Sequence, residues 1–258
     1  MLVTRVTPES RRRRPDEVIV EEPMEIQLDG TIVSTTMRTP GHDYELAAGF
    51  CFTDGLLGGA PLTGVRYCAK GSAVESEFNV VTVETAGRAP VPTPRLTTTS
   101  SSCGLCGSAS LEALTDRLLP LPNDLVRAPI ETFARIAEQA VAGQGLFATT
   151  GAVHAAAAFD VTGTPSIIRE DVGRHNAVDK VVGRLFLDDR LPAHDLGLFV
   201  SGRASFEIVQ KAWAAGFGTI VAVSAPTALA VHTARRAGMM LAGFIRGDGL
   251  NIYAPERL

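Results

Sequence analysis

The chain has 258 residues, of which 45% are hydrophobic and 20% charged, and this composition is typical of a folded globular protein. Its 28 acidic side chains outnumber its 24 basic ones and give a net charge of −4. This argues against a nucleic-acid-binding protein, because such proteins need a basic surface. The sequence has no run of about 18 apolar residues and no secretory signal, so we expect a cytoplasmic protein that does not enter a membrane.

The first part of the chain is expected to be rich in β-structure. Residues 1–14 include four consecutive arginines and are interpreted as a disordered basic tail. Residues 15–119 are predicted to form an N-terminal β-rich domain that ends in a Cys-x-x-Cys loop and a helix. Within it we expect strands at residues 18–20, 24–28, 31–38, 65–69 and 77–84, and helices at residues 43–57 and 108–119.

Residues 120–258 are predicted to form a second, α/β domain. Short apolar strands alternate with helices here, and this alternation indicates a sheet with helices on both faces. We expect helices at residues 132–142, 173–187, 204–215 and 228–237, and strands at residues 152–159, 166–169, 196–200, 219–223 and 240–245.

The four cysteines are too few for a disulfide scaffold at this length, but two of them form the sharpest local motif. Cys103-Gly-Leu-Cys106 precedes a predicted helix, and the N-terminus of a helix favours a thiolate over a thiol. A glycine after each cysteine keeps the sulfur atoms accessible. The spacing fits a zinc half-site, a dithiol redox pair or a sulfur carrier; two ordinary buried cysteines are the structural alternative.

Two strand-to-helix junctions in the second domain carry side chains suited to an anion. The first has Arg174 and His175 at the start of a helix, and the second has Ser201, Gly202 and Arg203. Backbone N–H groups at such turns and arginine side chains bind phosphate, and ligands of open α/β sheets collect at the carboxyl ends of strands. A well-capped helix start is the alternative at each junction.

A third segment with binding potential is residues 244–249. Gly247 and Gly249 permit close approach of the backbone to a ligand, Arg246 suits phosphate, and Asp248 is suited to accept hydrogen bonds from a guanine edge. The alternative is an Asp-Gly hairpin that joins two strands. His154 lies in an alanine-rich strand and is interpreted as a packed residue rather than a catalytic one.

Together these segments resemble the FdhD family. The resemblance extends from about residue 17 to the C-terminus, and it implies an α/β fold (α+β overall). In that fold a smaller N-terminal β-rich domain accompanies a cytidine-deaminase-like, three-layer αβα C-terminal domain. The segments that carry it are Arg38-Thr-Pro-Gly-His-Asp43, Leu46-Ala-Ala-Gly-Phe50, Ser102-Cys-Gly-Leu-Cys-Gly107, Thr150-Gly-Ala-Val-His154, residues 169–180, Ser201-Gly-Arg203, Ser224-Ala-Pro226 and residues 244–249.

The resemblance also implies a function. FdhD proteins are sulfurtransferases that accept sulfur from a cysteine desulfurase as a cysteine persulfide. They pass it to the molybdenum cofactor, Mo-bis(molybdopterin guanine dinucleotide), before its insertion into the formate dehydrogenase apoenzyme. The family is associated with homodimers. By resemblance the persulfide-bearing residue is Cys103, while Cys106 has a less defined resolving or shielding role.

The binding residues follow from the same resemblance. The cofactor-binding segment matches Phe244, Ile245, Arg246, Gly247, Asp248 and Gly249, to which the two junctions add Arg174, His175, Ser201, Gly202 and Arg203. We expect GDP, a fragment of the cofactor, to bind there.

Two other functions compete with the sulfur carrier. A zinc deaminase needs His-x-Glu followed by Pro-Cys-x-x-Cys, but the corresponding helix starts read His175-Asn-Ala and Ser201-Gly-Arg. We therefore expect no tightly bound zinc. A chaperone that binds the cofactor without moving sulfur would need no thiol pair, so the Cys-x-x-Cys motif argues against it.

Overall fold

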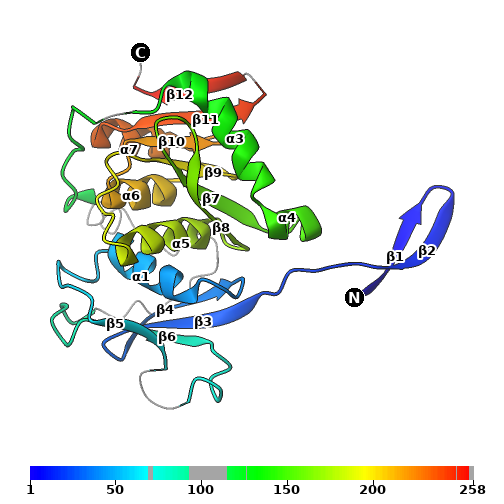
Figure 1. Cartoon of the computed structure of the whole chain (residues 1–258), viewed down its shortest axis with the longest axis horizontal. Coiled ribbons are helices and arrows are strands. Elements are labelled where there is room, and N and C mark those ends of the chain that lie inside the picture. The colour runs from blue at the N-terminus through cyan, green and yellow to red at the C-terminus, as the bar shows by residue number, and fades with distance from the viewer. Residues whose placement is uncertain (69–71, 93–114, 126, 248, 256–258) are drawn as a thin grey trace.

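The computed structural model describes residues 1–68, 72–92, 115–125, 127–247 and 249–255. The strands in these residues form a two-stranded, a four-stranded and a six-stranded sheet. In Figure 1 the six-stranded sheet and its helices make the larger unit, the four-stranded sheet lies below it, and the two-stranded hairpin projects to one side. No helix among the described residues is long and apolar enough to span a membrane.

The six-stranded sheet is the centre of the larger unit. Its three parallel strands β9, β10 and β11 are flanked by antiparallel neighbours, in the order β12-β11-β10-β9-β7-β8. The predicted α/β sheet is therefore confirmed, with one more strand, β12, which the sequence analysis implied only through the alternative of a hairpin at residues 244–249. The strands are β7 (His154–Phe159), β8 (Pro165–Asp171), β9 (Gly197–Val200), β10 (Thr219–Ala222), β11 (Met240–Arg246) and β12 (Gly249–Ala254).

Helices cover both faces of this sheet, as predicted. Alternation along β9 shows why: Leu198 and Val200 join a core cluster with three helices, whereas Phe199 joins a second cluster on the opposite face. The first face is covered by α5 (Arg174–Leu187), α6 (Phe206–Ala215) and α7 (Ala228–Ala237). The second face is covered by α3 (Phe133–Ala142). The 3-10 turn η1 (Ile130–Thr132) precedes α3 in the chain, and the short helix α4 (Gly145–Thr150) follows it. The unit thus has three layers; its likeness to cytidine deaminases stays a prediction.

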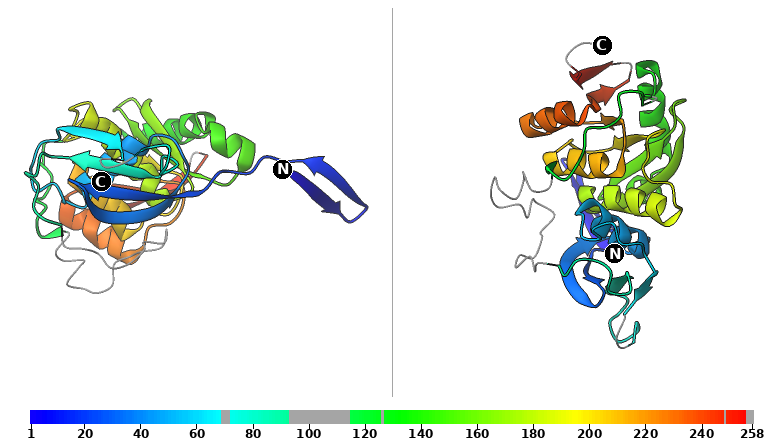
Figure 2. Two further views of the ribbon diagram at one scale, coloured as in Figure 1. Left: turned by 90° about the horizontal axis from the view of Figure 1, so that it is seen from below. Right: turned by 90° about the vertical axis from the view of Figure 1, so that its left-hand side faces the viewer.

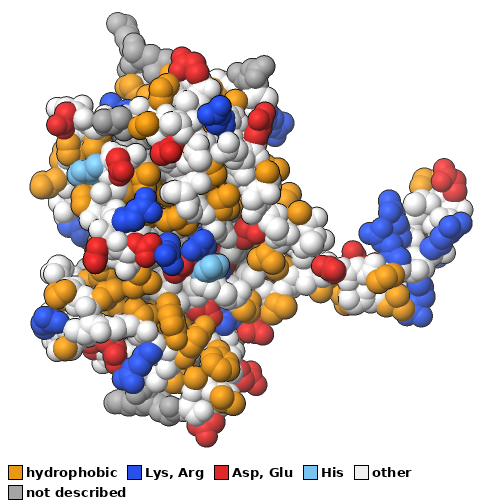
Figure 3. Space-filling view, in the orientation of Figure 1, with side chains coloured by type: hydrophobic (Ala, Val, Ile, Leu, Met, Phe, Trp, Pro, Cys, Tyr) orange, Lys and Arg blue, Asp and Glu red, His pale blue; other side chains and the backbone are white. Residues whose placement is uncertain are grey.

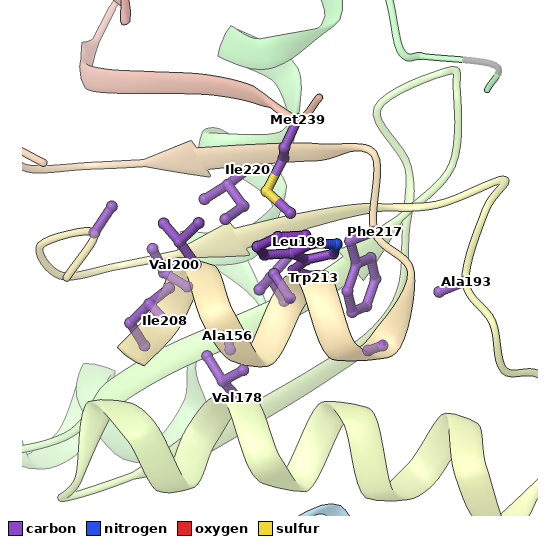
Figure 4. Packing of buried hydrophobic residues seen from close by; sticks show 14 of the residues in the cluster. Ala156, Val178, Ala193, Leu198, Val200, Ile208, Trp213, Phe217, Ile220 and Met239 are labelled. Atoms are coloured by element: carbon purple, nitrogen blue, oxygen red, sulfur yellow. The ribbon is translucent and has the colours of Figure 1, made fainter. Parts of the chain in front are cut away.

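The core between the sheet and α6 is built around the single tryptophan (Figure 4). Trp213 is 3% exposed and packs in one cluster with Leu198, Ile220 and Met239. Its indole N–H donates to the carbonyl of Leu119 (2.7 Å), so its polar edge is satisfied. The chain before the large sheet is thereby tied to α6.

The four-stranded sheet has its own core. Met24, Ile26 and Leu28 alternate with more exposed residues on β3, and their buried side chains pack with Leu46 and Ala47 of α1. The strand order is β4-β3-β6-β5, with β3 and β6 parallel. The elements are β3 (Glu22–Leu28), β4 (Thr31–Arg38), α1 (Asp43–Thr53), β5 (Gly64–Tyr67) and β6 (Val80–Glu84).

Helix α1 joins the two units because it packs closely on α5. At Gly49 an added Cβ would lie 1.9 Å from the carbonyl oxygen of Asp179, and at Gly183 it would lie 1.8 Å from that of Glu45. Only glycine permits this approach of the two backbones. Figure 2 shows α1 and α5 side by side between the two sheets.

The disordered tail predicted for residues 1–14 is wrong. These residues form a hairpin of β1 (Leu2–Thr7) and β2 (Ser10–Pro15), whose base is closed by hydrogen bonds between Met1 and Asp16 (2.7 and 2.8 Å). The β-branched residues of β1 favour a strand, whereas the prediction of a tail rests on the arginine run. Conversely, residues 18–20 were predicted as a strand but have no regular structure.

Other differences lie at element ends. The helix predicted for residues 43–57 ends at Thr53, because Gly55, Gly58 and Gly59 in the next turn all have positive φ. Helix α4 was not predicted. Most of the helix predicted for residues 108–119 lies outside the described residues, and the domain boundary after residue 119 stays a prediction.

Candidate functional site

The described candidate residues converge on one edge of the large sheet. The parallel strands β9, β10 and β11 end at this edge, the antiparallel strand β7 begins there, and β8 ends there. Hydrogen bonds connect the loops that follow: Ser224 N–H donates to the Gly202 carbonyl, and Phe244 N–H donates to the Ser224 carbonyl (both 3.3 Å). The predicted junctions at residues 173–175 and 201–203 and the segment at 244–247 thus share one edge.

Asp171 holds the turn from β8 into α5. Its fully buried carboxylate pairs with Lys180 (2.7 Å) and accepts hydrogen bonds from the N–H of Gly173 (2.7 Å) and the side-chain amide of Asn176 (2.9 Å). It also accepts from the N–H of Thr39 (3.1 Å), which lies before α1. A buried ion pair with this many partners fixes the backbone that carries Arg174.

Arg174, Gly202 and His154 lie together at the edge. A Cβ at Gly202 would lie 3.4 Å from His154 Nδ1 and 3.9 Å from Arg174 Cδ. Arg174 Nε is buried and has no hydrogen-bond partner in the described part of the chain. An unpartnered buried N–H is costly, and an anionic ligand at the glycine would satisfy it. Burial, followed by the charge of Arg174, lowers the pKa of His154.

His175 lies between two residues of the neighbouring helix start. Its Nε2 is 3.2 Å from the hydroxyl of Ser205, and its Nδ1 is 3.4 Å from the carboxylate of Glu207. Burial, helped by the charges of Arg174 and Lys211, lowers its pKa to about 3, so the ring is neutral at physiological pH. The carboxylate favours the proton on Nδ1, which leaves Nε2 to accept from the hydroxyl.

The second junction is only partly available to a ligand. The Ser201 N–H donates to the carbonyl of Ala155 (2.9 Å), and the Ser201 hydroxyl accepts from the N–H of Ala155 (2.8 Å). The Ser201 N–H is therefore not available to an anion, because it holds β7 to β9, and the predicted anion-binding turn at Ser201-Gly202 stays a prediction. The groups at this junction that remain available to a ligand are the Ser201 hydroxyl proton, the Gly202 turn and the exposed Arg203.

The segment at residues 244–249 contains the end of β11 and the start of β12, which pair antiparallel with Arg246 opposite Gly249. Phe244 is 43% exposed and has a φ of 54°, a strained conformation for a bulky residue. Ile245 is buried in the cluster under α3, so its side chain faces away from any ligand at this surface. Arg246 is exposed, whereas Asp248 lies outside the described residues.

The Cys103–Cys106 motif also lies outside the described residues. Of the other cysteines, Cys51 is fully buried in the N-terminal core, and burial, followed by the charges of Asp54 and Asp179, raises the pKa of its thiol. Cys68 is half-buried with its thiol 3.0 Å from the hydroxyl of Ser76. Cys51 is therefore poorly suited to act as a nucleophile.

The structure adds features that the sequence analysis did not single out. Ser205 and Glu207 complete the surroundings of His175, and their position two and four residues after Arg203 was the available signal. Two cavities, of about 270 and 250 Å³, lie elsewhere, one beside Phe52 and Phe186 and one beside His42 and Arg169. Within the described ranges, no three His, Cys, Asp or Glu side chains are grouped to hold a metal ion.

Comparison with known proteins identifies the family. Residues 19–258 match the model of the FdhD/NarQ family. A Nocardia farcinica protein named sulfur carrier protein FdhD is 46% identical, with 98% of this chain and 91% of that protein covered. A Streptomyces avermitilis protein of the same name is 48% identical, with 94% of this chain and 89% of that protein covered.

A solved structure supports the fold. It is that of a candidate formate dehydrogenase accessory protein from Desulfotalea psychrophila, with a TM-score of 0.78 and 23% identity over all of this chain and 97% of that one. The match extends over both sheet units described above. On the family model and the close relatives, this chain belongs to the FdhD/NarQ family.

Proposed function

We propose that the chain is a sulfur carrier required for formate dehydrogenase activity. It takes sulfur from a cysteine desulfurase as a persulfide on Cys103 and transfers it to the molybdenum cofactor before insertion into the apoenzyme. Family membership together with the Cys103-Gly-Leu-Cys106 motif carries this proposal. The relatives named as sulfur carrier proteins support it.

The loading step is a thiol–disulfide type of exchange. The Cys103 thiolate attacks the outer sulfur of the desulfurase persulfide; one S–S bond forms, the donor's S–S bond breaks, and the desulfurase thiolate leaves. Sulfur moves at a constant oxidation level, so no external oxidant or reductant is needed. The chain thus acts as a sulfurtransferase, and Cys106, three residues after Cys103 in the sequence, is proposed to resolve or shield the persulfide.

The sheet edge is the proposed site for the nucleotide ends of the substrate, Mo-bis(molybdopterin guanine dinucleotide). Arg174, with its buried unpartnered Nε beside Gly202, suits a phosphate oxygen, and Arg203 adds a second cation. Phe244, Arg246, Gly247, Asp248 and Gly249 are proposed to receive the guanine, with GDP as a fragment analogue. His175 and the hydroxyl of Ser201 are proposed as further polar groups of this nucleotide site.

We place the sulfur transfer in the cytoplasm and propose that the protein acts as a homodimer without tightly bound zinc.

Intact-mass measurement after incubation with a cysteine desulfurase and cysteine tests the carrier role. We expect a gain of about 32 Da, one sulfur atom, on Cys103. The gain is lost in Cys103→Ser together with formate dehydrogenase activation. The matched controls Cys51→Ala and Cys68→Ser keep it, because one thiol is buried and the other lies outside the motif.

Calorimetry with GDP tests the edge site separately. Arg174→Ala is expected to weaken GDP binding by about 1.5–3 kcal/mol, the value of a hydrogen bond to a charged group. Binding of GDP with no persulfide on Cys103 would favour a cofactor chaperone. Full activation by Cys103→Ser would show that the carrier proposal is wrong.

A further inference from the structure

The cavity of about 270 Å³ beside Phe52 and Phe186 lies where the two sheet units meet. Its described lining residues are Phe52, Phe186, Asp189, Leu191 and Pro192. Phe52 packs against the core cluster of the large sheet and also against that of the N-terminal sheet. Ligand sites form preferentially at such junctions between units. The cavity thus has the position of a binding site that is separate from the sheet edge.

Two aromatic rings line the cavity. The rings of Phe52, from α1, and Phe186, from α5, have centroids 4.9 Å apart and are tilted by 45° to each other. Both residues are only partly buried, and Leu187, next to Phe186 in the chain, is 41% exposed. Aromatic faces attract cations as well as apolar groups. A side chain that enters the cavity therefore meets a surface suited to an apolar stem or to a cation.

Asp189 stands at the end of α5, in a position where glycine is usual. The N–H of Arg190 donates to the Leu185 carbonyl (2.8 Å), and the N–H of Asp189 donates to the Phe186 carbonyl (3.2 Å). These two bonds form a Schellman motif, whose left-handed residue is here Asp189, with a φ of 55°. The helix dipole also disfavours a carboxylate at the C-terminal end of a helix. Local structure alone would therefore favour glycine at this position.

The Asp189 carboxylate also lacks the partner that its neighbour has. Asp188 forms an ion pair with Arg184 (2.8 Å), whereas no group in the described part of the chain pairs with the carboxylate of Asp189. A residue that breaks two local preferences without a contact in return is expected at a functional site. Since Asp189 lines the cavity, a ligand in the cavity is the contact that this carboxylate is placed to make.

The lining favours a single cationic side chain as the ligand. None of the described lining residues is basic, so a nucleotide bound here would leave its phosphates without a cation. The cavity is also smaller than pockets for drug-sized molecules, which measure roughly 300–1,000 Å³. A guanidinium matches both features, because its flat face packs on an aromatic ring and its paired N–H groups donate to both oxygens of a carboxylate.

We propose that this cavity is a docking pocket for an arginine side chain of a partner protein, with Asp189 as the carboxylate that receives it. The partner presents this arginine among apolar side chains, which meet the exposed Leu187. Arginine is among the residues that dominate binding at protein interfaces. The pocket and the sheet edge are separate sites, because Arg174 is the first residue of α5 and Asp189 follows its last turn.

A peptide titration tests the pocket directly. The probe is acetyl-Leu-Arg-Leu-amide, and its binding is observed through the methyl signals of Leu191 in NMR spectra. We expect these signals to shift, and Asp189→Asn to weaken the binding at least tenfold, because a hydrogen-bonded pair of charges is lost. Asp195→Asn changes an exposed aspartate outside the described lining; as the matched control it keeps wild-type affinity.

Two further probes identify the group that the pocket recognises. The same peptide with citrulline in place of arginine keeps the shape but has no charge, and we expect it to bind at least tenfold more weakly. GMP should leave the Leu191 signals unchanged. Equal binding of the two peptides, equal binding of the arginine peptide to wild type and Asp189→Asn, or shifts caused by GMP alone would overturn the proposal.

Substitution by glycine separates binding from stability. Asp189→Gly relieves the left-handed conformation and removes a carboxylate from the helix end, so we expect its melting temperature to rise by about 2–4 °C. We expect the same variant to lose binding of the arginine peptide. A melting temperature below that of wild type would mean that Asp189 stabilises its own turn, and retained binding would mean that the carboxylate is not needed. Either result would overturn the proposal.

In naming the partner, the proposal rests on the proposed function, in which a desulfurase and an apoenzyme both dock on the chain. We expect Asp189→Asn to weaken the binding of one of these two purified proteins about tenfold in biolayer interferometry, while GDP binding at the sheet edge keeps wild-type affinity. No loss with either protein would overturn the assignment of a protein partner. Failure of Cys103 to load would remove the proposed function and leave the peptide results standing.

Discussion

At the scale of single residues, buried charges define the candidate site more than exposed ones do. Asp171 and Lys180 are 0% and 1% exposed and are paired at 2.7 Å, and Lys180 also donates to the carbonyl of Thr39 (2.9 Å). Through Asp171 the pair binds the turn before α5 to the chain before α1. The geometry of Arg174 therefore depends on residues more than 130 positions away in the sequence.

Removing one partner of this pair is expected to be severe. Lys180→Met leaves the Asp171 carboxylate buried without its cation, which typically costs 3–5 kcal/mol, so we expect a loss of about 4 kcal/mol of unfolding free energy. Arg66→Ala is the control, because it breaks the exposed Arg66–Glu84 pair (2.7 Å) and is expected to cost less than about 1 kcal/mol. Urea denaturation of both variants measures the difference; equal losses would contradict it.

His175 gives the fold a defined dependence on pH. Its folded pKa of about 3 is below its unfolded value of 6.5, so the unfolded chain binds the extra proton between these two values. The contribution of the neutral His175 ring to the free energy of unfolding is therefore complete above pH 6.5. It is lost as the pH falls towards 3, by at most about 1.4 kcal/mol per pH unit. Denaturation of wild type and His175→Gln at pH 7 and 5 should show a smaller pH effect in the variant, while His232→Gln at an exposed position behaves like wild type.

At the scale of elements, the sequence pattern predicts a strand or helix correctly where the element has a strongly apolar, buried face. The apolar strands β9, β10 and β11 and the helices α5, α6 and α7 lie within a few residues of their predicted positions. Helix α4 was missed because it has only six residues and none of them is buried, so no apolar face marked it. Strand β12 is half-exposed and follows a turn whose residues were interpreted as a ligand loop.

The candidate site was only partly predictable, because local sequence patterns indicate which turns meet but not which side chains contact each other there. The motifs at residues 169–180 and 201–203 identified which turns meet, because strand ends of one sheet share an edge. They did not reveal that Ser201 holds β7 to β9, or that His175 faces Ser205 and Glu207. Those facts depend on side-chain contacts between elements, which no local pattern encodes.

The contact of α1 with α5 depends on the absence of side chains at two glycines. Gly49→Ala would bring a Cβ within 1.9 Å of the Asp179 carbonyl, and neither backbone can move without shifting a helix. The gain in helix propensity, about 1 kcal/mol, is outweighed by an expected loss of about 3 kcal/mol or more from overpacking. Gly145→Ala, at the start of α4 with nothing within 4 Å, is the control and should be close to neutral in thermal melts.

At the scale of the whole molecule, charge is unevenly distributed along the chain. Residues 1–15 hold five arginines and one glutamate, whereas residues 16–92 hold four basic and twelve acidic side chains. The first group is the projecting hairpin, which stands apart with its basic side chains exposed in Figure 3. The net charge of −4 is thus the sum of contributions from a basic hairpin and an acidic N-terminal sheet unit.

The hairpin is expected to contribute almost nothing to the stability of the rest of the protein. Its residues belong to none of the three core clusters, and Arg5 lies directly opposite Arg12, a repulsive cross-strand pair. A two-stranded hairpin without a covered face is only marginally stable by itself. Removing residues 1–17 leaves 19 basic and 25 acidic side chains, a net charge of −6, and an intact larger unit. We expect the midpoint and slope of urea denaturation to match those of the full chain; a lower midpoint would mean that the hairpin packs on the body of this chain or of a second copy.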